Sequence, residues 1–188
     1  NVLNKYITEG YPRIRKYCRA KDVAIIFHDG FRSFHEYVGF LKEPEFSNVA
    51  MDIHRYQCFV QSDIDLDIYG HLRLNVIDWK QEADDVNANL GHPVYLGEWS
   101  LGLHLKFVSL WVENSIEDKL QTMDGFQKSL AYRAYAATQL MTFEKYAGWF
   151  FWSYKTETTP QWCFRECVER GWLPDNFDSR TIDENFLS

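Results

Sequence analysis

One glutamate is notable because it lies in a segment that is otherwise apolar. Glu98 follows Gly97 and precedes Trp99 at the end of the run Val94–Trp99. An ionised carboxylate needs a specific reason to remain in such surroundings. If this run is a strand, Trp99 points to the opposite face and the carboxylate projects into a cleft. The structural alternative is a strand-terminal glutamate paired with a nearby arginine or lysine.

A second polar group lies further up the chain. Asp52, His54 and Tyr56 alternate within the segment 48–56, so on a strand all three point to the same side. We expect Asp52 to lie deepest and Tyr56 nearest the mouth, where a histidine and a tyrosine can orient a carboxylate or bond a sugar hydroxyl. The alternative is a satisfied core histidine beside a packed tyrosine. Phe59 is either a loop anchor or a platform for a sugar.

Aromatic side chains are unusually frequent, with 7 Trp, 11 Tyr and 14 Phe in 188 residues. Flat rings can serve as platforms for the apolar faces of sugars, although buried aromatics are also ordinary core material. In the segment 148–155, Trp152 and Tyr154 share one face of an expected strand, and Trp149 and Phe151 share the other. One of these faces must point inward, and Trp152 at a strand end would make a flat floor for a pyranose ring.

Four short apolar runs read as strands, and each ends in polar or aromatic residues: 23–28, 48–56, 94–99 and 148–155. The continuous apolar character of the first predicts burial on both faces. Longer segments read as helices: 3–18 with a kink or a new start at Pro12, 31–41, 69–89, and a short one at 162–170. Another begins at an Asp124 capping box and has one apolar stripe: Phe126, Leu130, Ala134, Ala137 and Met141.

Strands that alternate with helices predict an α/β protein with a parallel sheet. The polar strand ends then lie on one face, which is the active face of a (β/α)8 TIM barrel. A closed barrel needs eight strands over roughly 250 residues, and this chain supplies about four βα units. We therefore predict a single domain over residues 1–188 that forms the C-terminal half of a barrel.

These elements resemble family 5 glycoside hydrolases, in the exo-1,3-β-glucanase-like branch. The resemblance rests on four motifs in order: His28-Asp29, the segment 52–59, Gly97-Glu98-Trp99-Ser100, and the segment 148–157. It implies a retaining hydrolase of β-glucans or β-glucosides, in particular a glucan 1,3-β-glucosidase, with Glu98 as nucleophile. His54 and Tyr56 would be its active-site partners, and the substrate would be bound by Phe59, Trp152, His28, Asp29 and Tyr154.

The chain departs from the family in one important respect. The family's general acid/base is the glutamate of an Asn-Glu-Pro motif at the end of the fourth barrel strand, and no such motif occurs here. We expect the isolated chain to need the missing half-barrel or a homodimer partner. A non-catalytic carbohydrate-binding or assembly fragment is the alternative function. A related barrel hydrolase acting on mannan, cellulose or a glucosylated lipid or small molecule also stays open.

Composition excludes several partners. A net charge of −7 argues against nucleic acid, and no run of roughly 20 apolar residues suggests a membrane span. No cluster has metal-ligand spacing, so we expect neither metal nor organic cofactor. The cysteines, at positions 18, 58, 163 and 167, allow two disulfides, but the sequence favours reduced thiols. They also do not match the disulfides of secreted fungal members, which favours a cytoplasmic location over a secreted one.

Overall fold

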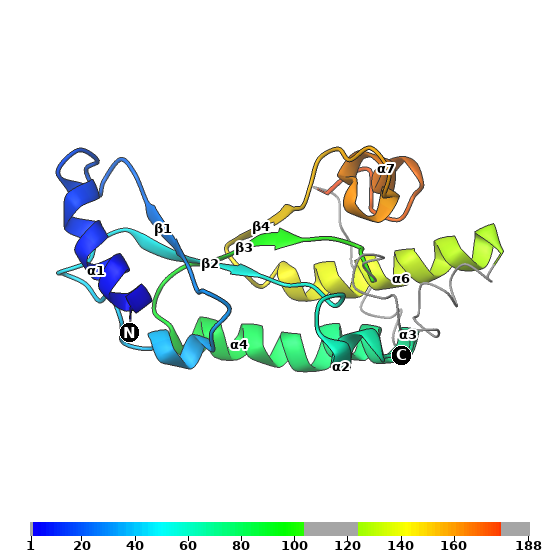
Figure 1. Ribbon diagram of the computed structural model, residues 1–188, viewed down its shortest axis with the longest axis horizontal. Helices are drawn as coiled ribbons and strands as arrows, with labels where there is room; N and C mark the ends of the chain where they lie inside the picture. Colours follow the sequence, from blue (N-terminus) through cyan, green and yellow to red (C-terminus); the bar gives the residue numbers. More distant parts are fainter. Residues whose placement is uncertain (1, 104–123, 178–188) are drawn as a thin grey trace.

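The computed structural model describes residues 2–103 and 124–177. Its centre is a parallel sheet in the order β1-β2-β3-β4, so neighbours in the sheet are also neighbours along the chain. The strands are β1 (Ile25–His28), β2 (Val49–His54), β3 (Val94–Trp99) and β4 (Gly148–Phe151). Helices alternate with them (Figure 1). This arrangement confirms the predicted α/β class and corresponds to part of an α/β barrel.

Strand β1 departs from its predicted burial. Phe27 is buried, but Ile26 on the opposite face is 52% exposed. The strand pairs only with β2 among the described residues and forms one edge of the sheet there. A continuous apolar run therefore indicates that both faces of a strand can be buried. Whether they are buried depends on the elements that pack against the strand.

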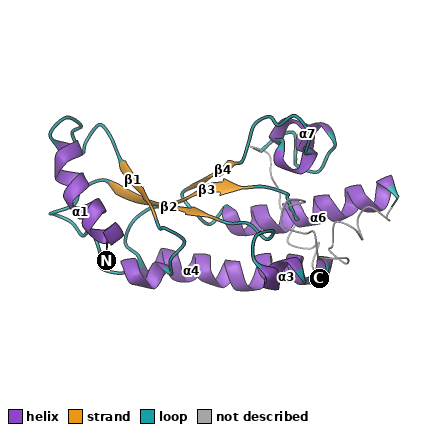
Figure 2. Ribbon diagram, in the orientation of Figure 1, coloured by secondary structure: helices purple, strands orange, loops and turns teal. Residues whose placement is uncertain are grey.

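The core lies between the outer face of the sheet and the helices. Met51, Ile53, Leu96 and Trp99 are at most 2% exposed on this side. Helices α4 (Lys80–Asn89) and α6 (Gly125–Phe143) run along it (Figure 2). The opposite, inner face carries the polar strand ends. Among the described residues, no helix is both long enough and apolar enough to cross a membrane.

The first helix is continuous, whereas the helix expected at 31–41 is nearly absent. Helix α1 (Val2–Arg15) runs through Pro12, so no second helix starts there. In the segment 31–41 only a short 3-10 turn forms, η1 (Phe34–Tyr37). Phe31 and Leu41 have φ of 57° and 55°, which a right-handed helix excludes.

The helix expected at 69–89 is present as three consecutive segments. A short α2 (Gln61–Ile64) precedes α3 (Ile68–Arg73), the π-helical η2 (Leu74–Trp79) and α4. The π-helical segment was not predicted, because hydrophobic periodicity cannot distinguish it from an α-helix. After β4 the chain forms η3 (Pro160–Trp162) and then α7 (Phe164–Glu169). Helix α7 matches the short helix expected at 162–170.

Helix α6 has its predicted capping box at Asp124, but the predicted apolar stripe was wrong. Phe126 and Leu130 are 77% and 56% exposed. The buried face instead carries Tyr132, Tyr135, Ala136, Thr138, Gln139, Leu140, Thr142 and Phe143. Threonine, glutamine and tyrosine count as polar in a hydropathy pattern, so their burial was missed. Thr138, Gln139 and Thr142 form hydrogen bonds on the buried face.

All four cysteines are free thiols, as the sequence favoured. Cys163 and Cys167 are buried and lie one helical turn apart, because the amide of Cys167 donates to the carbonyl of Cys163. Burial raises the pKa of the Cys167 thiol to about 12. That thiol therefore stays protonated and unreactive near neutral pH.

Candidate active site

The polar ends of three neighbouring strands meet at one edge of the sheet. His28 pairs in register with Asp52, and His54 pairs with Glu98. The carboxyl ends of parallel strands lie on the same side, which is where TIM-barrel enzymes place their active sites. The predicted arrangement of His54 and Glu98 at one edge is therefore present.

A register shift at Gly97 sets the direction of Glu98. Ile53 pairs with Leu96 and His54 with Glu98, so Gly97 is the extra residue of a bulge. A Cβ atom on Gly97 would lie 1.9 Å from Oδ1 of Asp52, so only glycine fits beneath that carboxylate. After the bulge, Trp99 is fully buried in the core against Phe143. Glu98 is consequently left facing the pocket, as the sequence predicted.

A hydroxyl and an imidazole nitrogen converge on one oxygen of Glu98. The hydroxyl of Tyr56 donates to Oε2 over 2.9 Å, and Nδ1 of His54 lies 3.3 Å from the same oxygen. On its other side, Nε2 of His54 is 3.2 Å from Oδ2 of Asp52. The three same-facing residues of the segment 48–56 therefore lie in one connected group, in which His54 links two carboxylates.

The structural alternative for Glu98, an ion pair with arginine or lysine, is not found among the described residues. Arg55, whose backbone amide donates to the carbonyl of Glu98, instead pairs its side chain with Glu82 over 2.6 Å. Burial raises the pKa of the Tyr56 hydroxyl, and its hydrogen bond to Glu98 raises it further. Tyr56 therefore remains a hydrogen-bond donor across the physiological range. The group fixes Oε2 of Glu98 and leaves Oε1 available to a bound molecule.

Glu98 lines an aromatic pocket of about 450 Å³. The pocket is lined by Phe31, Tyr56, Phe59, Glu98, Trp152 and Trp162. Phe59 and Trp152 are 53% and 52% exposed, so their rings are accessible at its rim. Ligand pockets typically combine such apolar walls with a few placed polar groups. The pocket therefore combines one carboxylate with a wall of aromatic rings.

Two pocket residues were not identified from the sequence, which placed Phe31 and Trp162 in helices. The Trp162 ring stacks on Tyr56 with centroids 5.3 Å apart. Its other side lies on Gly102, where a Cβ atom would come within 2.5 Å of the indole. The only sequence signal was Gly102 shortly after the Glu98 motif, since a glycine often marks the close approach of another group.

The other expected substrate-binding residues lie around the pocket. His28 contacts the rings of Phe31 and His54 at 4.9 and 4.4 Å. Asp29 is 2% exposed and accepts the amide of Phe31 over 2.8 Å, so it shapes the turn beside the pocket. Tyr154 is 69% exposed and does not line the pocket. Strand β4 ends at Phe151, so the expected alternation does not extend to Tyr154.

His28, Asp52 and His54 present possible metal-ligand atoms within 4.8 Å of one another. The hydrogen bond of His28 decides what its ring offers. Its Nδ1 accepts the amide of Gly30 over 2.9 Å, which places the proton of the neutral imidazole on Nε2. His28 therefore presents a donor rather than a free lone pair. This arrangement suits a hydrogen bond to an oxygen better than coordination of a cation.

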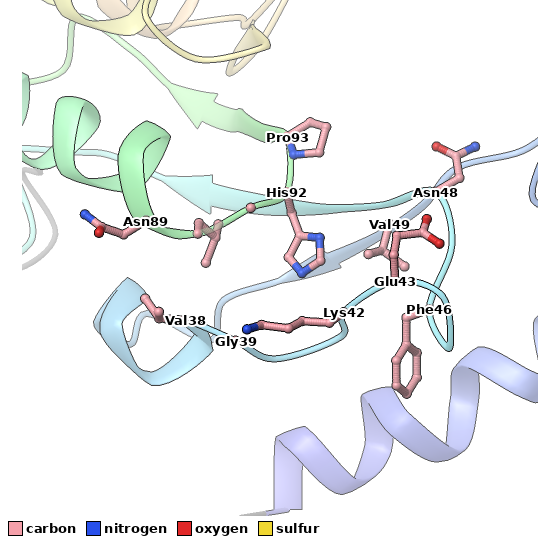
Figure 3. A pocket seen from close by; sticks show the side chains of 12 residues that line it. Val38, Gly39, Lys42, Glu43, Phe46, Asn48, Val49, Asn89, His92 and Pro93 are labelled. Atoms are coloured by element: carbon pink, nitrogen blue, oxygen red, sulfur yellow. The ribbon is translucent and has the colours of Figure 1, made fainter.

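A larger pocket of about 570 Å³ lies at the opposite end of the sheet (Figure 3). Its lining comes from the loop after β1 and from the segments that begin β2 and precede β3. His92 there is bound to the carbonyl of Phe40 over 2.7 Å. None of the predicted site residues lines this pocket. The smaller pocket at Glu98 is therefore the better candidate, despite its volume.

Comparisons with known proteins identify similar sequences among glucan 1,3-beta-glucosidases. The chain is 28% identical to glucan 1,3-beta-glucosidase 2 of Wickerhamomyces anomalus and 28% identical to a glucan 1,3-beta-glucosidase of Candida oleophila. Each match covers 95% of this chain and 45% of the relative. The glucan 1,3-beta-glucosidase of Blumeria graminis is 26% identical, over 96% of this chain and 46% of that protein. No family model matches the chain.

The fold is also found in a solved structure. The crystal structure of AoRut matches with a TM-score of 0.60 over 91% of this chain and 42% of that chain, at 16% identity. This likeness supports the fold alone. The relatives above confirm the resemblance stated from the motifs. The chain is a relative of proteins named glucan 1,3-beta-glucosidase, and it spans about 45% of the length of the relatives it matches.

Proposed function

We propose that this chain carries the nucleophile of a retaining β-glycoside hydrolase that acts on β-glucans or β-glucosides, with Glu98 in that role. The observation that carries the proposal is the convergence of Tyr56 and His54 on Oε2 of Glu98, at 2.9 and 3.3 Å, inside an aromatic pocket. The names of the relatives support glucan 1,3-β-glucosidase as the particular activity.

In this reaction Oε1 of Glu98 attacks the anomeric carbon while the glycosidic oxygen leaves, and water later hydrolyses the glycosyl ester. Tyr56 and His54 keep the carboxylate oriented by holding its second oxygen. Trp152 and Phe59, with their exposed rings, offer flat surfaces for the sugar. We propose that His28 supports the pocket through its ring contacts with Phe31 and His54, whereas Asp29 acts through the turn that it holds.

The general acid/base is proposed to come from outside this chain. A retaining mechanism needs two carboxyl groups roughly 5 Å apart, and Glu98 is the single carboxylate lining the described pocket. Positioned proton transfer typically contributes about 10²- to 10⁴-fold to such reactions. We therefore expect the isolated chain to hydrolyse ordinary β-glucosides poorly or not at all, and the partner that completes the site to be the other half-barrel.

The first test uses a substrate that needs little acid assistance. The chain is incubated with a 2-deoxy-2-fluoro-β-glucoside carrying a dinitrophenyl leaving group, and the intact mass is measured. We expect one covalent sugar, mapped by peptide sequencing to Glu98 and absent from Glu98→Gln. Glu157→Gln, an exposed glutamate on the loop after β4, is the matched control and should label like the parent. Labelling elsewhere, or none in a folded sample, would contradict the proposal.

The same observation of a single pocket carboxylate also fits a non-catalytic carbohydrate-binding fragment. This second function predicts that β-glucan oligosaccharides quench the fluorescence of Trp152 and Trp162 with no labelling of Glu98. Binding should then survive Glu98→Gln and weaken in Trp152→Ala. Covalent labelling of Glu98 would exclude this function.

A further inference from the structure

Gln57, the residue directly after Tyr56, is fully buried although it lies in a loop. Both ends of its amide are bonded. Oε1 lies 2.6 Å from Nδ1 of His71, and Nε2 donates to Oδ1 of Asn75 over 2.6 Å. The segment that carries Tyr56 belongs to no helix or strand, so these two bonds connect it to the helices behind the pocket.

The connection continues into helix α6. Nδ2 of Asn75 donates to Oγ1 of Thr138 over 2.9 Å, and Oγ1 of Thr142 donates to the backbone carbonyl of Asn75 over 2.7 Å. Asn75 belongs to the π-helical segment η2, where a carbonyl is released from the regular α-helical ladder. We call Gln57, His71, Asn75, Thr138 and Thr142 the buried relay. Each of the five residues takes part in at least one of these bonds.

The protonation state of His71 determines which groups donate and which accept in the buried relay. Burial lowers the pKa of this imidazole to about 4, so the ring is neutral near pH 7. Because Gln57 presents an oxygen, Nδ1 of His71 must carry the proton and donate it. Gln57 is thereby restrained to accept from one helix and donate to the next.

The restraint on Gln57 also limits the position of its neighbour Tyr56. The centroid of the Tyr56 ring lies 5.3 Å from that of Trp162 and 5.1 Å from that of Phe59, and its hydroxyl donates to Glu98. Ring packing alone permits sliding, whereas a bonded neighbour fixes the backbone from which the ring extends. We propose that Gln57 is a positioning residue: through the buried relay it holds Tyr56 where the hydroxyl donates to Glu98. The expected effect of Gln57 on the reactivity of Glu98 rests on the proposed function. Its effect on the hydrogen bond between Tyr56 and Glu98 does not.

The hydrogen bond can be tested without any hydrolase activity. Tetranitromethane nitrates tyrosine through the phenolate, so a Tyr56 released from Glu98 should react faster. We expect Gln57→Met and Gln57→Glu to raise the nitration rate of Tyr56 on the order of tenfold relative to the exposed Tyr154. Val86→Ala, a buried truncation in α4, is the control and should leave this ratio unchanged. Unchanged Tyr56 nitration in both folded Gln57 variants would overturn the proposal.

A double-mutant cycle then tests the chemistry. Tyr56→Phe and Gln57→Met should each slow fluoroglucoside labelling of Glu98 on the order of tenfold, and the double variant should be no slower than Tyr56→Phe. Val86→Ala should combine with Tyr56→Phe additively. Additive effects of Gln57→Met would mean that Gln57 does not act through Tyr56. If even the parent chain is not labelled, the proposed function fails, while the nitration result still decides the role of Gln57.

Discussion

At the scale of residues, the candidate site depends on one glycine as much as on its polar groups. Gly97 supplies the bulge that turns Glu98 toward the pocket, and Asp52 occupies the space that any larger side chain would need. Asp52 in turn contacts His54, which contacts Glu98. A methyl group at position 97 would therefore disturb the whole polar group.

We predict that Gly97→Ala lowers the free energy of unfolding by about 1–3 kcal/mol, because overpacking forces Asp52 or the strand to move. The same variant should lose labelling of Glu98. Urea denaturation followed by tryptophan fluorescence measures the first effect. Gly125→Ala is the matched control, since a Cβ atom there has nothing within 4 Å. Equal stability of the two variants would show that the bulge tolerates a side chain.

At the scale of elements, helix α6 buries a different face from the one its hydropathy predicts. Tyr132, Tyr135 and Phe143 are fully buried, and Gln139 donates to the carbonyl of Ser100 behind the Glu98 strand. The exposed face carries Phe126 and Leu130. This helix therefore supports the pocket from behind through polar and aromatic contacts.

We expect Phe126→Gln and Leu130→Gln to change the free energy of unfolding by less than about 0.5 kcal/mol, because both side chains are mostly in solvent. Leu140→Ala, on the buried face of the same helix, should cost about 2–5 kcal/mol. Chemical denaturation of the three variants provides the comparison. A large loss from either surface variant would mean that this face is covered in solution.

At the scale of the whole molecule, the sheet ends in open edges among the described residues. Strands β1 and β4 each pair with a single neighbour, and Ile26 and Phe150 are 52% and 60% exposed on them. Unpaired strand edges with apolar side chains favour association. We propose that this chain joins the other half-barrel, or a second copy of itself, through these edges.

Size-exclusion chromatography with light scattering should accordingly give a mass above the 22.3 kDa of one chain. Ile26→Lys and Phe150→Lys should shift the distribution toward the single chain, because charges on an edge oppose pairing. Lys substitution at the exposed Phe126, away from both edges, is the control. A stable monomer at micromolar concentration in the parent would exclude self-association.

The pH dependence of stability also belongs to the whole molecule. Burial lowers the pKa of His71 to about 4 in the folded state, against about 6.5 when unfolded. The unfolded chain therefore binds the extra proton first, and stability falls as the pH drops below about 6.5 and levels off near 4. The total loss is on the order of 3 kcal/mol. His71→Asn should remove this slope between pH 7 and 5, whereas His35→Asn, on an exposed residue, should keep it.

Much of this protein could be predicted from local patterns. Strand β3 and its terminal Glu98, the alternation that aligns Asp52, His54 and Tyr56, and the capping box of α6 each depend on neighbours along the chain. The spacing of residues along the chain determines which way their side chains point, because side chains alternate on a strand and recur every turn on a helix. The four motifs in order were enough to indicate the family.

Only the tertiary structure decided which distant side chains meet. The positive φ of Phe31 and Leu41 is incompatible with the expected helix. Trp162 reaches the pocket because it stacks on Tyr56 and because Gly102 leaves room for its indole. The buried relay joins Gln57 to helix α6, whose polar residues looked solvent-exposed in the pattern. Hydropathy measures the cost of leaving water for each residue alone. Whether a polar group is buried depends on a hydrogen-bond partner that only the folded chain brings to it.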